Sequence, residues 1–307
     1  MNISRIPELL GVKYPVILGV VGAEHVKLAA AVSEAGGLGV LHGGKIARGA
    51  REKKEMRDPM QEMKRLTVNP FSINIPITLV GKDYADALVN LAIDEGIKAV
   101  TTSAGSARTY TERLKKANIK VLHVVATVNH AVKAMEAGVD VVIASGIEAG
   151  GWQSREEVTT FALIPQVVDA IKGRIPVVAA GGIGDARGIL AAFSLGAEGV
   201  QVGTRFLASI EASLEDDYKE AIIRAGDNST EIIGRGERPA RNWTLDFLNE
   251  VRPGYTRPKA GPRQSAGQVA GMVKEILSVE EIMRQMVGGI SVEYARLSKQ
   301  LTPFMPD

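Results

Sequence analysis

The 307-residue sequence contains no cysteine and only four histidines. Without cysteine the chain can form no disulfide, offers no thiolate nucleophile and cannot bind a metal through sulfur, and we expect no metal site. The net charge is only +2, so no global field favours nucleic acid or a membrane surface. No stretch approaches the ~18 apolar residues of a membrane-spanning helix, and residues 1–15 lack the apolar run of a signal peptide. We therefore expect a cytoplasmic protein with a small-molecule substrate, no nucleic-acid or membrane partner, and possible homo-oligomers.

Short apolar runs rich in β-branched residues recur along the first two thirds of the chain, and this pattern is typical of strands buried on both faces. The eight runs lie at 16–20, 38–42, 70–77, 98–104, 120–126, 139–145, 175–181 and 199–204. Helical patterns such as 83–95 and 185–195 separate them. Several of these patterns end in glycine, which suits the left-handed residue of a helix C-cap.

Eight strand–helix units in succession predict a (β/α)8 TIM barrel of the α/β class. An open doubly wound sheet is the alternative, but no second-domain signal interrupts the eight units. We expect residues 1–212 to form the barrel and residues 213–307 to form a lid and helical extension that packs on it. Within that extension, helical character resumes at 265–299.

Residues 235–263 are rich in Gly, Pro and Arg and carry seven Arg or Lys against three acids. One interpretation is a solvated irregular loop. The other is a lid whose arginines, Arg238 and Arg241 among them, meet phosphate on a cofactor or substrate. The sequence leaves both open.

The active site of such a barrel forms at the carboxyl ends of its strands. The strand ends offer Gly19, His42, Asn74, Ser103, Thr127 and the stretch from Ser145 to Trp152. Phosphate sites in barrels usually follow strands seven and eight, beside a helix N-terminus. Here Gly181 and Gly182 precede a helix that begins near Asp185, and Gly203 and Thr204 follow the eighth strand. We predict that these backbone amides and the threonine hydroxyl bind phosphate.

The motifs together resemble the nitronate monooxygenase (2-nitropropane dioxygenase) family of FMN-dependent barrels, which is related to the type II enoyl-ACP reductases. The resemblance rests on KYPVILG, AAAVSEAGGLGVL, PFSINI, EAGG, EEVTTFALIPQVV, PVVAAGGIGDARG, GAEGVQVGTRFLAS and SAGQVAG. It implies FMN with its phosphate on the two glycine loops and its ring near Asn74 and the loop after the first strand. The implied cofactor-binding residues are Gly19, Asn74, Ser145, Gly150, Gly151, Gly181, Gly182, Gln201, Gly203 and Thr204.

The sequence departs from the family at two places. The family usually has Gln-Gly after the first strand, where this chain has Leu18–Gly19. The family motif EAGGH carries the proposed catalytic base or substrate ligand, but here EAGG is followed by Trp152. An indole donates a hydrogen bond and cannot take up a proton near neutral pH, unlike histidine.

Three interpretations of Trp152 remain open. Its ring could shape the pocket by stacking on flavin or substrate, the base could have moved to His42, or the indole could fill the pocket of an inactive protein. Glu148 could act as an acid or base, or could anchor its loop by accepting backbone N–H bonds. His123, inside the fifth strand, is expected to be a hydrogen-bonded core residue.

The resemblance predicts an FMN-dependent oxidoreductase that oxidises a small substrate through flavin N5. The first alternative is a reductase of enoyl-thioesters or quinones that takes electrons from NADH or NADPH. The second is a flavin-binding protein without turnover. In either of the two enzymes the cofactor would supply the redox chemistry, and the protein would supply position and electrostatics.

Overall fold

The eight predicted strands form the wall of a barrel. The computed structural model describes residues 4–20, 26–49, 53–154, 156–233, 241–245 and 265–304. Its parallel eight-stranded sheet has the order β1-β9-β8-β6-β5-β4-β3-β2, and a bridge between Ile17 and Leu38 joins the two ends. The strands are β1 (Val16–Leu18), β2 (Gly39–His42), β3 (Phe71–Pro76), β4 (Ala99–Ser103), β5 (Lys120–Val125), β6 (Val141–Ser145), β8 (Val177–Ala180) and β9 (Gly199–Val202). The predicted (β/α)8 barrel is confirmed, since each strand falls within its predicted run.

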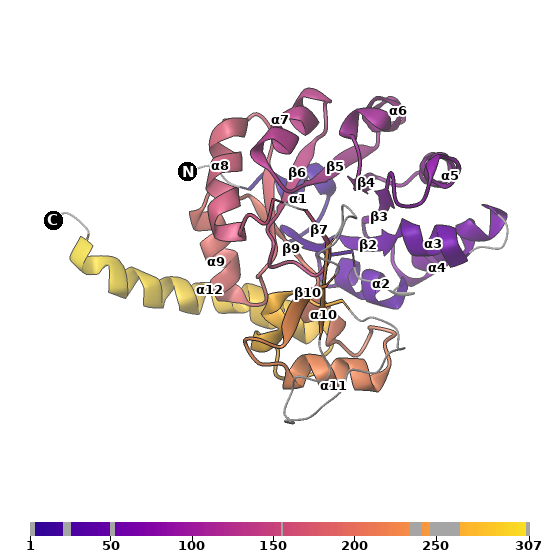
Figure 1. Ribbon diagram of the computed structural model, residues 1–307. Helices are drawn as coiled ribbons and strands as arrows, with labels where there is room; N and C mark the ends of the chain where they lie inside the picture. The colour runs from indigo at the N-terminus through magenta and orange to yellow at the C-terminus, as the bar shows by residue number, and fades with distance from the viewer. Residues whose placement is uncertain are drawn as a thin grey trace.

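Helices cover the outside of the barrel, because each parallel connection must cross from one end of the sheet to the other (Figure 1). The helices up to β9 are α1 (Ile6–Leu10), α2 (Val26–Glu34), α3 (Gly43–Gly49), α4 (Asp58–Leu66), α5 (Lys82–Asp94), α6 (Thr111–Lys116), α7 (Val128–Glu136), α8 (Thr160–Ile171) and α9 (Ala186–Ser194). The predicted helices at 83–95 and 185–195 correspond to α5 and α9. Asp185 begins α9 by accepting hydrogen bonds from the backbone amides of Arg187 and Gly188.

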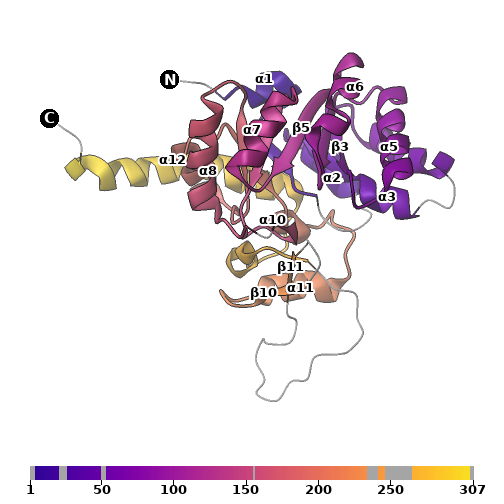
Figure 2. The same ribbon diagram turned by 45° about the horizontal axis from the view of Figure 1, so that its top comes forward.

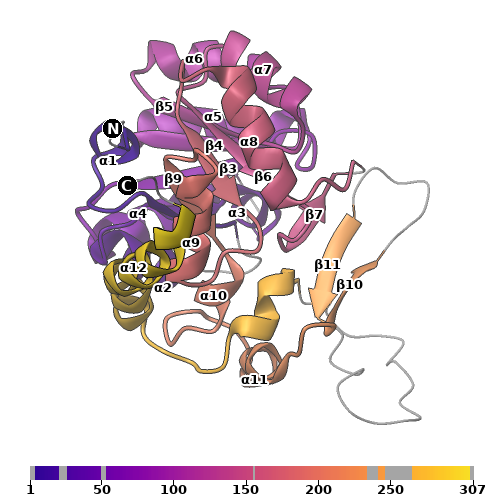
Figure 3. The same ribbon diagram turned by 90° about the vertical axis from the view of Figure 1, so that its left-hand side faces the viewer.

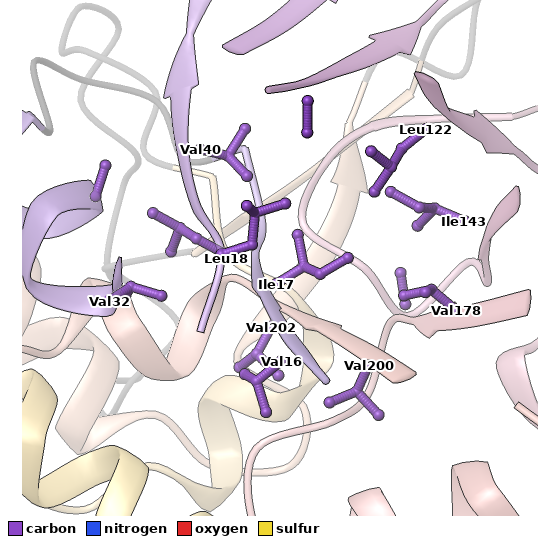
Figure 4. Packing of buried hydrophobic residues seen from close by; sticks show 14 of the residues in the cluster. Val16, Ile17, Leu18, Val32, Val40, Leu122, Ile143, Val178, Val200 and Val202 are labelled. Atoms are coloured by element: carbon purple, nitrogen blue, oxygen red, sulfur yellow. The ribbon is translucent and has the colours of Figure 1, made fainter. Parts of the chain in front are cut away.

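Branched side chains fill the core of the barrel (Figure 4). Ile17, Leu122, Ile143 and Val178 are each fully buried. Full burial of such a side chain contributes about 1.5–3 kcal/mol to the stability of the fold. Together these side chains form a packed apolar layer below the strand ends.

Three helices of the carboxyl-terminal part lie below and beside the barrel (Figure 2). They are α10 (Thr204–Leu207), α11 (Asp216–Arg224) and the long α12 (Val279–Leu301), which packs on α2 and α9. The predicted helical stretch from 265 begins as a short 3-10 helix at Gln268–Met272, and the α-helix starts only at Val279. Within the part of the chain that the structure describes, no helix is long and apolar enough to cross a lipid bilayer.

A small antiparallel sheet stands beside the barrel instead of in its wall (Figure 3). Its order is β10-β11-β7, formed by β10 (Thr230–Ile233), β11 (Arg241–Leu245) and β7 (Gly151–Gln153). Residues 241–245 were expected to be irregular and instead form β11, because pairing with β7 satisfies their backbone groups. Arg238 and the rest of the predicted lid, residues 235–240 and 246–263, lie outside the described residues.

His123 is a buried, hydrogen-bonded residue of β5, as predicted. Its side chain is only 5% exposed, and its Nδ1 lies 2.7 Å from Thr102 Oγ1. Burial, assisted by the nearby charge of His130, lowers the pKa of His123 to about 4. The folded protein therefore resists protonation at a site that the unfolded chain protonates near pH 6.5.

Acidification should consequently weaken the fold through His123. Because the folded pKa is the lower one, this stability is complete above about pH 6.5 and declines as the pH falls toward 4. Between pH 7 and pH 4.5 the loss attributable to His123 should be about 2–3 kcal/mol. Urea denaturation at both pH values should show a smaller pH dependence in His123→Gln than in wild type. His130→Gln, an exposed control, should keep most of the wild-type dependence, and equal dependence in all three proteins would contradict the assignment.

Candidate functional site

The strand register places four of the predicted site residues on the inner face of the barrel. A Cβ on Gly39 would strike the backbone of α2 at Ala29, so Gly39 faces outward, and alternation turns His42 inward. His42 is paired with Asn74 on the neighbouring strand, and paired residues of a sheet point to the same side. The same pairing chain brings Ser145 and Gln201 to the inner face through Ala180, which pairs with both. The mouth of the barrel is thus polar, above an apolar core.

Asn74 is held in place by Ser103, the end of β4. Asn74 is 2% exposed, and its Nδ2 donates to Ser103 Oγ at 3.1 Å. Sequence reasoning noted Ser103 only as a strand end. Its role as a partner of Asn74 depends on the β3–β4 register, in which Pro76 pairs with Ser103, and this register is not encoded in a local motif.

Glu148 anchors the loop that follows β6. Its Oε1 and Oε2 accept the backbone N–H of Thr160, at 2.9 and 2.8 Å. Thr160 Oγ1 lies 2.9 Å from Glu148 Oε2 and 3.1 Å from the carbonyl oxygens of Ala180 and Gly181. The start of α8 therefore ties together the loops after β6 and β8. These contacts are those of the anchoring interpretation, and no local motif indicated Thr160 as the partner.

Removing the Glu148 carboxylate should lower the stability of the fold more than it lowers turnover. Glu148→Ala leaves the Thr160 N–H unsatisfied in a half-buried site and should destabilise the fold by about 2–3 kcal/mol. Glu148→Gln retains an acceptor oxygen, so its melting temperature should fall much less and its turnover should persist. Thermal unfolding together with steady-state kinetics would check both, with Glu156→Ala, an exposed glutamate of the same loop, as control. Turnover abolished in Glu148→Gln at unchanged stability would show a catalytic acid or base instead.

The two glycine loops form a backbone cradle after β8 and β9. Gly181 and Gly182 have φ values of +101° and +71°, a conformation that favours glycine. A Cβ on Gly182 would have no heavy atom nearer than 3.7 Å, so it would make only ordinary contacts with the Glu148 side chain. Thr204 is buried, and its Oγ1 accepts the Gly267 N–H at 2.9 Å. Accepting that bond leaves the hydroxyl hydrogen of Thr204 able to donate to a ligand.

The helix N-terminus beside this cradle contributes less than the sequence suggested. Asp185 Oδ1 already accepts the amides of Arg187 at 2.9 Å and Gly188 at 3.3 Å. A phosphate at this position would depend on the amides of Gly181 and Gly182 more than on the first turn of α9.

Residues Ala266–Gln268 lie across the same loops and were not selected from the sequence as site residues. The amide of Gln268 donates to the carbonyl oxygen of Glu148 at 3.0 Å. A Cβ on Gly150 would come within 2.8 Å of the Gly267 nitrogen, and one on Gly19 within 2.9 Å of the Gly203 Cα. Gly150 and Gly19 therefore allow backbone segments to pack against each other. Gly151, with φ +81° and open space around it, is required by its backbone conformation.

Trp152 lies in a strand and not in a free loop. It is the middle residue of β7 and is paired with Asn242 of β11. The backbone of the position where the family motif has histidine is thus fixed by the small sheet. His42, the other candidate for the base, is the last residue of β2.

The model of the nitronate monooxygenase family matches residues 4–264. The chain belongs to the nitronate monooxygenase family. A probable nitronate monooxygenase of Staphylococcus saprophyticus is 33% identical over 292 residues, covering 81% of this chain and 80% of that protein. A probable nitronate monooxygenase of Staphylococcus aureus is 31% identical over 293 residues, covering 81% of both chains.

Two solved structures are similar over almost the whole chain. FabK from Thermotoga maritima is 34% identical with a TM-score of 0.85, covering 98% of this chain and all of that one. A nitroalkane oxidase from Streptomyces ansochromogenes is 25% identical with a TM-score of 0.77, covering 95% and 99%. Membership of the nitronate monooxygenase family makes the chain an FMN-dependent oxidoreductase, the enzyme class that its motifs implied.

Proposed function

We propose that this protein holds FMN at the carboxyl-terminal mouth of its barrel and oxidises a small substrate of the nitronate type. The observation that carries the proposal is the meeting of a phosphate-sized backbone cradle with a polar inner ring. The cradle consists of Gly181, Gly182, Gly203 and Thr204, and the ring of His42, Asn74, Ser145 and Gln201. A flavin mononucleotide has a phosphate at one end and a polar, flat ring at the other, so this arrangement fits both.

The cradle residues fit a phosphate dianion. Gly182 is exposed, and the Thr204 hydroxyl can donate a hydrogen bond. Donors that point at an anion form charge-assisted hydrogen bonds, which are stronger than neutral ones. The fixed backbone of both glycines supplies these donors without loss of side-chain entropy.

The remaining residues position the substrate and control protons. When bound, FMN supplies a centre that accepts an electron or hydride equivalent. Asn74, held by Ser103, would be one of the residues that hold the flavin ring. A nitronate is already an anion, so its oxidation requires no base. Trp152 can donate one hydrogen bond but cannot remove a proton, and His42 is the inward-facing side chain of the ring that can titrate near neutral pH.

A second candidate is an NADH- or NADPH-dependent reductase of enoyl-thioesters or quinones. The observation that favours it is the likeness to FabK, an enoyl-ACP reductase, at 34% identity over 98% of this chain. The corresponding identity to the nitroalkane oxidase is 25%. A reductase of this kind would have no need of a base at position 152 for the reduction of its flavin.

An anaerobic flavin-reduction screen separates these functions. The purified protein should be yellow, and an alkyl nitronate added without oxygen should bleach it, whereas NADH and NADPH should not. Bleaching by a pyridine nucleotide would replace the first proposal with the second. A flavin that none of the donors reduces would identify a binding protein without turnover.

A further inference from the structure

The last helix extends beyond the body that it packs on. The first half of α12 is anchored, with Val279, Ile282, Met283 and Met286 buried. Its second half projects past the barrel in both views of the molecule (Figures 1 and 2). Tyr294 is 62% exposed there and Phe304, just beyond the helix, is 82% exposed. We call residues 290–304 the arm.

The arm carries an apolar stripe that starts on the anchored half. Its members are separated alternately by four and three residues: Met283, Val287, Ile290, Tyr294, Leu297, Leu301 and Phe304. This heptad spacing keeps side chains on one face of a helix and is the pattern by which helices pack against each other. Met283 is buried in the body, so one continuous stripe is covered at its start and uncovered at its end.

A groove runs along the anchored half of the same helix, between α2 and α12. It has a volume of about 710 Å³. Ala30 and Ala31 of α2, with Ala35 just beyond it, form its small-residue side, and Met283 and Val287 of the stripe form the other. Three Lys or Arg and three Glu line the groove as well, so its charges balance and two copies of the chain would not repel each other there.

We propose that the arm of a second copy of this chain occupies the groove, in a two-fold symmetric dimer. The anchored half and the arm belong to one straight helix and present one stripe. A two-fold axis near Ile290, across α12, turns the arm of each copy back along the anchored half of the other. The anchored segment 279–290 and the helical arm segment 290–301 each contain twelve residues, which corresponds to about 18 Å of helix. Arm and groove therefore match in length, and every contact occurs twice, as a two-fold interface requires.

The size of the contact also suits a stable dimer. Each copy would contribute fifteen residues of the arm and the fourteen residues that line the groove. Stable interfaces bury about 800 Å² and roughly 20–30 residues on each partner. Small alanines on α2 allow the bulky Tyr294 and Leu297 to approach closely.

The oligomeric state of arm variants tests this interface. Wild-type protein should sediment as a dimer at micromolar concentration. The double variant Tyr294→Glu/Leu301→Glu should raise the dissociation constant at least ~100-fold and give a monomer. Val292→Glu is the matched control, because Val292 is 68% exposed on the same arm but lies about 200° around the helix from Tyr294. It should remain dimeric, and circular dichroism should show all three proteins folded.

Engineered cysteines provide an independent test, since the natural chain has none. Ala31→Cys protein mixed with Leu297→Cys protein should form a disulfide-linked dimer under mild oxidation. Each variant oxidised by itself should give far less, because its cysteines lie on non-matching surfaces. A monomeric wild type, a dimer that survives charge on the stripe, or a dimer broken by Val292→Glu would each overturn the proposal.

Discussion

Replacing Gly182 with leucine should leave a folded but colourless protein. Gly182 has φ +71°, and a Cβ there would lie 3.7 Å from Glu148 Cβ and 3.9 Å from Glu148 Cγ, an ordinary contact distance. A leucine would therefore be strained in its backbone without clashing at its Cβ, and its side chain would occupy the proposed phosphate cradle. Loss of two hydrogen bonds to a charged phosphate, at about 1.5–3 kcal/mol each, would weaken FMN binding by roughly 10²–10⁴-fold. The ratio of flavin absorbance to protein absorbance after dialysis measures the loss.

The control for Gly182→Leu must carry the same backbone strain at a distance from the cradle. Gly138→Leu does so, because Gly138 has φ +86° and a Cβ there would meet nothing within 4 Å. Both variants should lose a similar amount of stability, about 1–2 kcal/mol from the left-handed conformation. Only Gly182→Leu should lose flavin. Wild-type flavin content in a folded Gly182→Leu protein would remove Gly182 from the phosphate site.

The barrel was predictable because its signals are local. Each strand is a short apolar run, because strands in this architecture are buried on both faces. The positions of these runs along the chain therefore located all eight strands. The inner face followed from the same periodicity once a single register was fixed. His42, Asn74 and Ser145 were chosen as strand-end residues and Gln201 from the family resemblance, and alternation brings all four to one side.

The contacts that organise the loops were not predictable, because they join residues far apart in the chain. Thr160 meets Glu148 across a 12-residue separation that includes β7, and Gly267 meets Thr204 from a segment 63 residues away. The pairing of β11 with β7 likewise depends on the path of the chain and not on any motif. Only the motifs EEVTTFALIPQVV and SAGQVAG marked these segments, and they did so by resemblance without indicating a contact.

The two glycines of the motif EAGG are required for different structural reasons, which the sequence alone could not distinguish. Gly150 is glycine because the backbone of Ala266–Gly267 packs against it, whereas Gly151 is glycine because its φ is +81°. Both requirements would exist without any cofactor. The glycines of this loop therefore fix the position of β7, and through it the position of residue 152, beside the mouth of the barrel.

Trp152→His should create an activity that the wild-type protein largely lacks, namely the oxidation of neutral nitroalkanes. A neutral nitroalkane must lose a proton from carbon before oxidation, whereas a nitronate has already lost it. The new imidazole would supply a base at the position where the family has one, on a backbone held by pairing with Asn242. General-base catalysis contributes about 10²–10⁴-fold when the geometry is correct. We expect a gain of only about 10–100-fold in kcat/KM, because the full factor requires a correctly oriented base and a newly introduced imidazole would be imperfectly placed.

The pH profile identifies the origin of the gain. An imidazole acts as a base only when neutral, so kcat/KM of Trp152→His for the nitroalkane should rise with pH through an ionisation near ~6.5. The rate with the matching nitronate should change much less, since that reaction needs no base. Stopped-flow flavin reduction with both substrates between pH 5 and 9 would measure this, with Trp152→Phe as the control that keeps an aromatic ring without a titrating group. Efficient nitroalkane oxidation by the wild type that is abolished in His42→Ala would show instead that the base resides on β2.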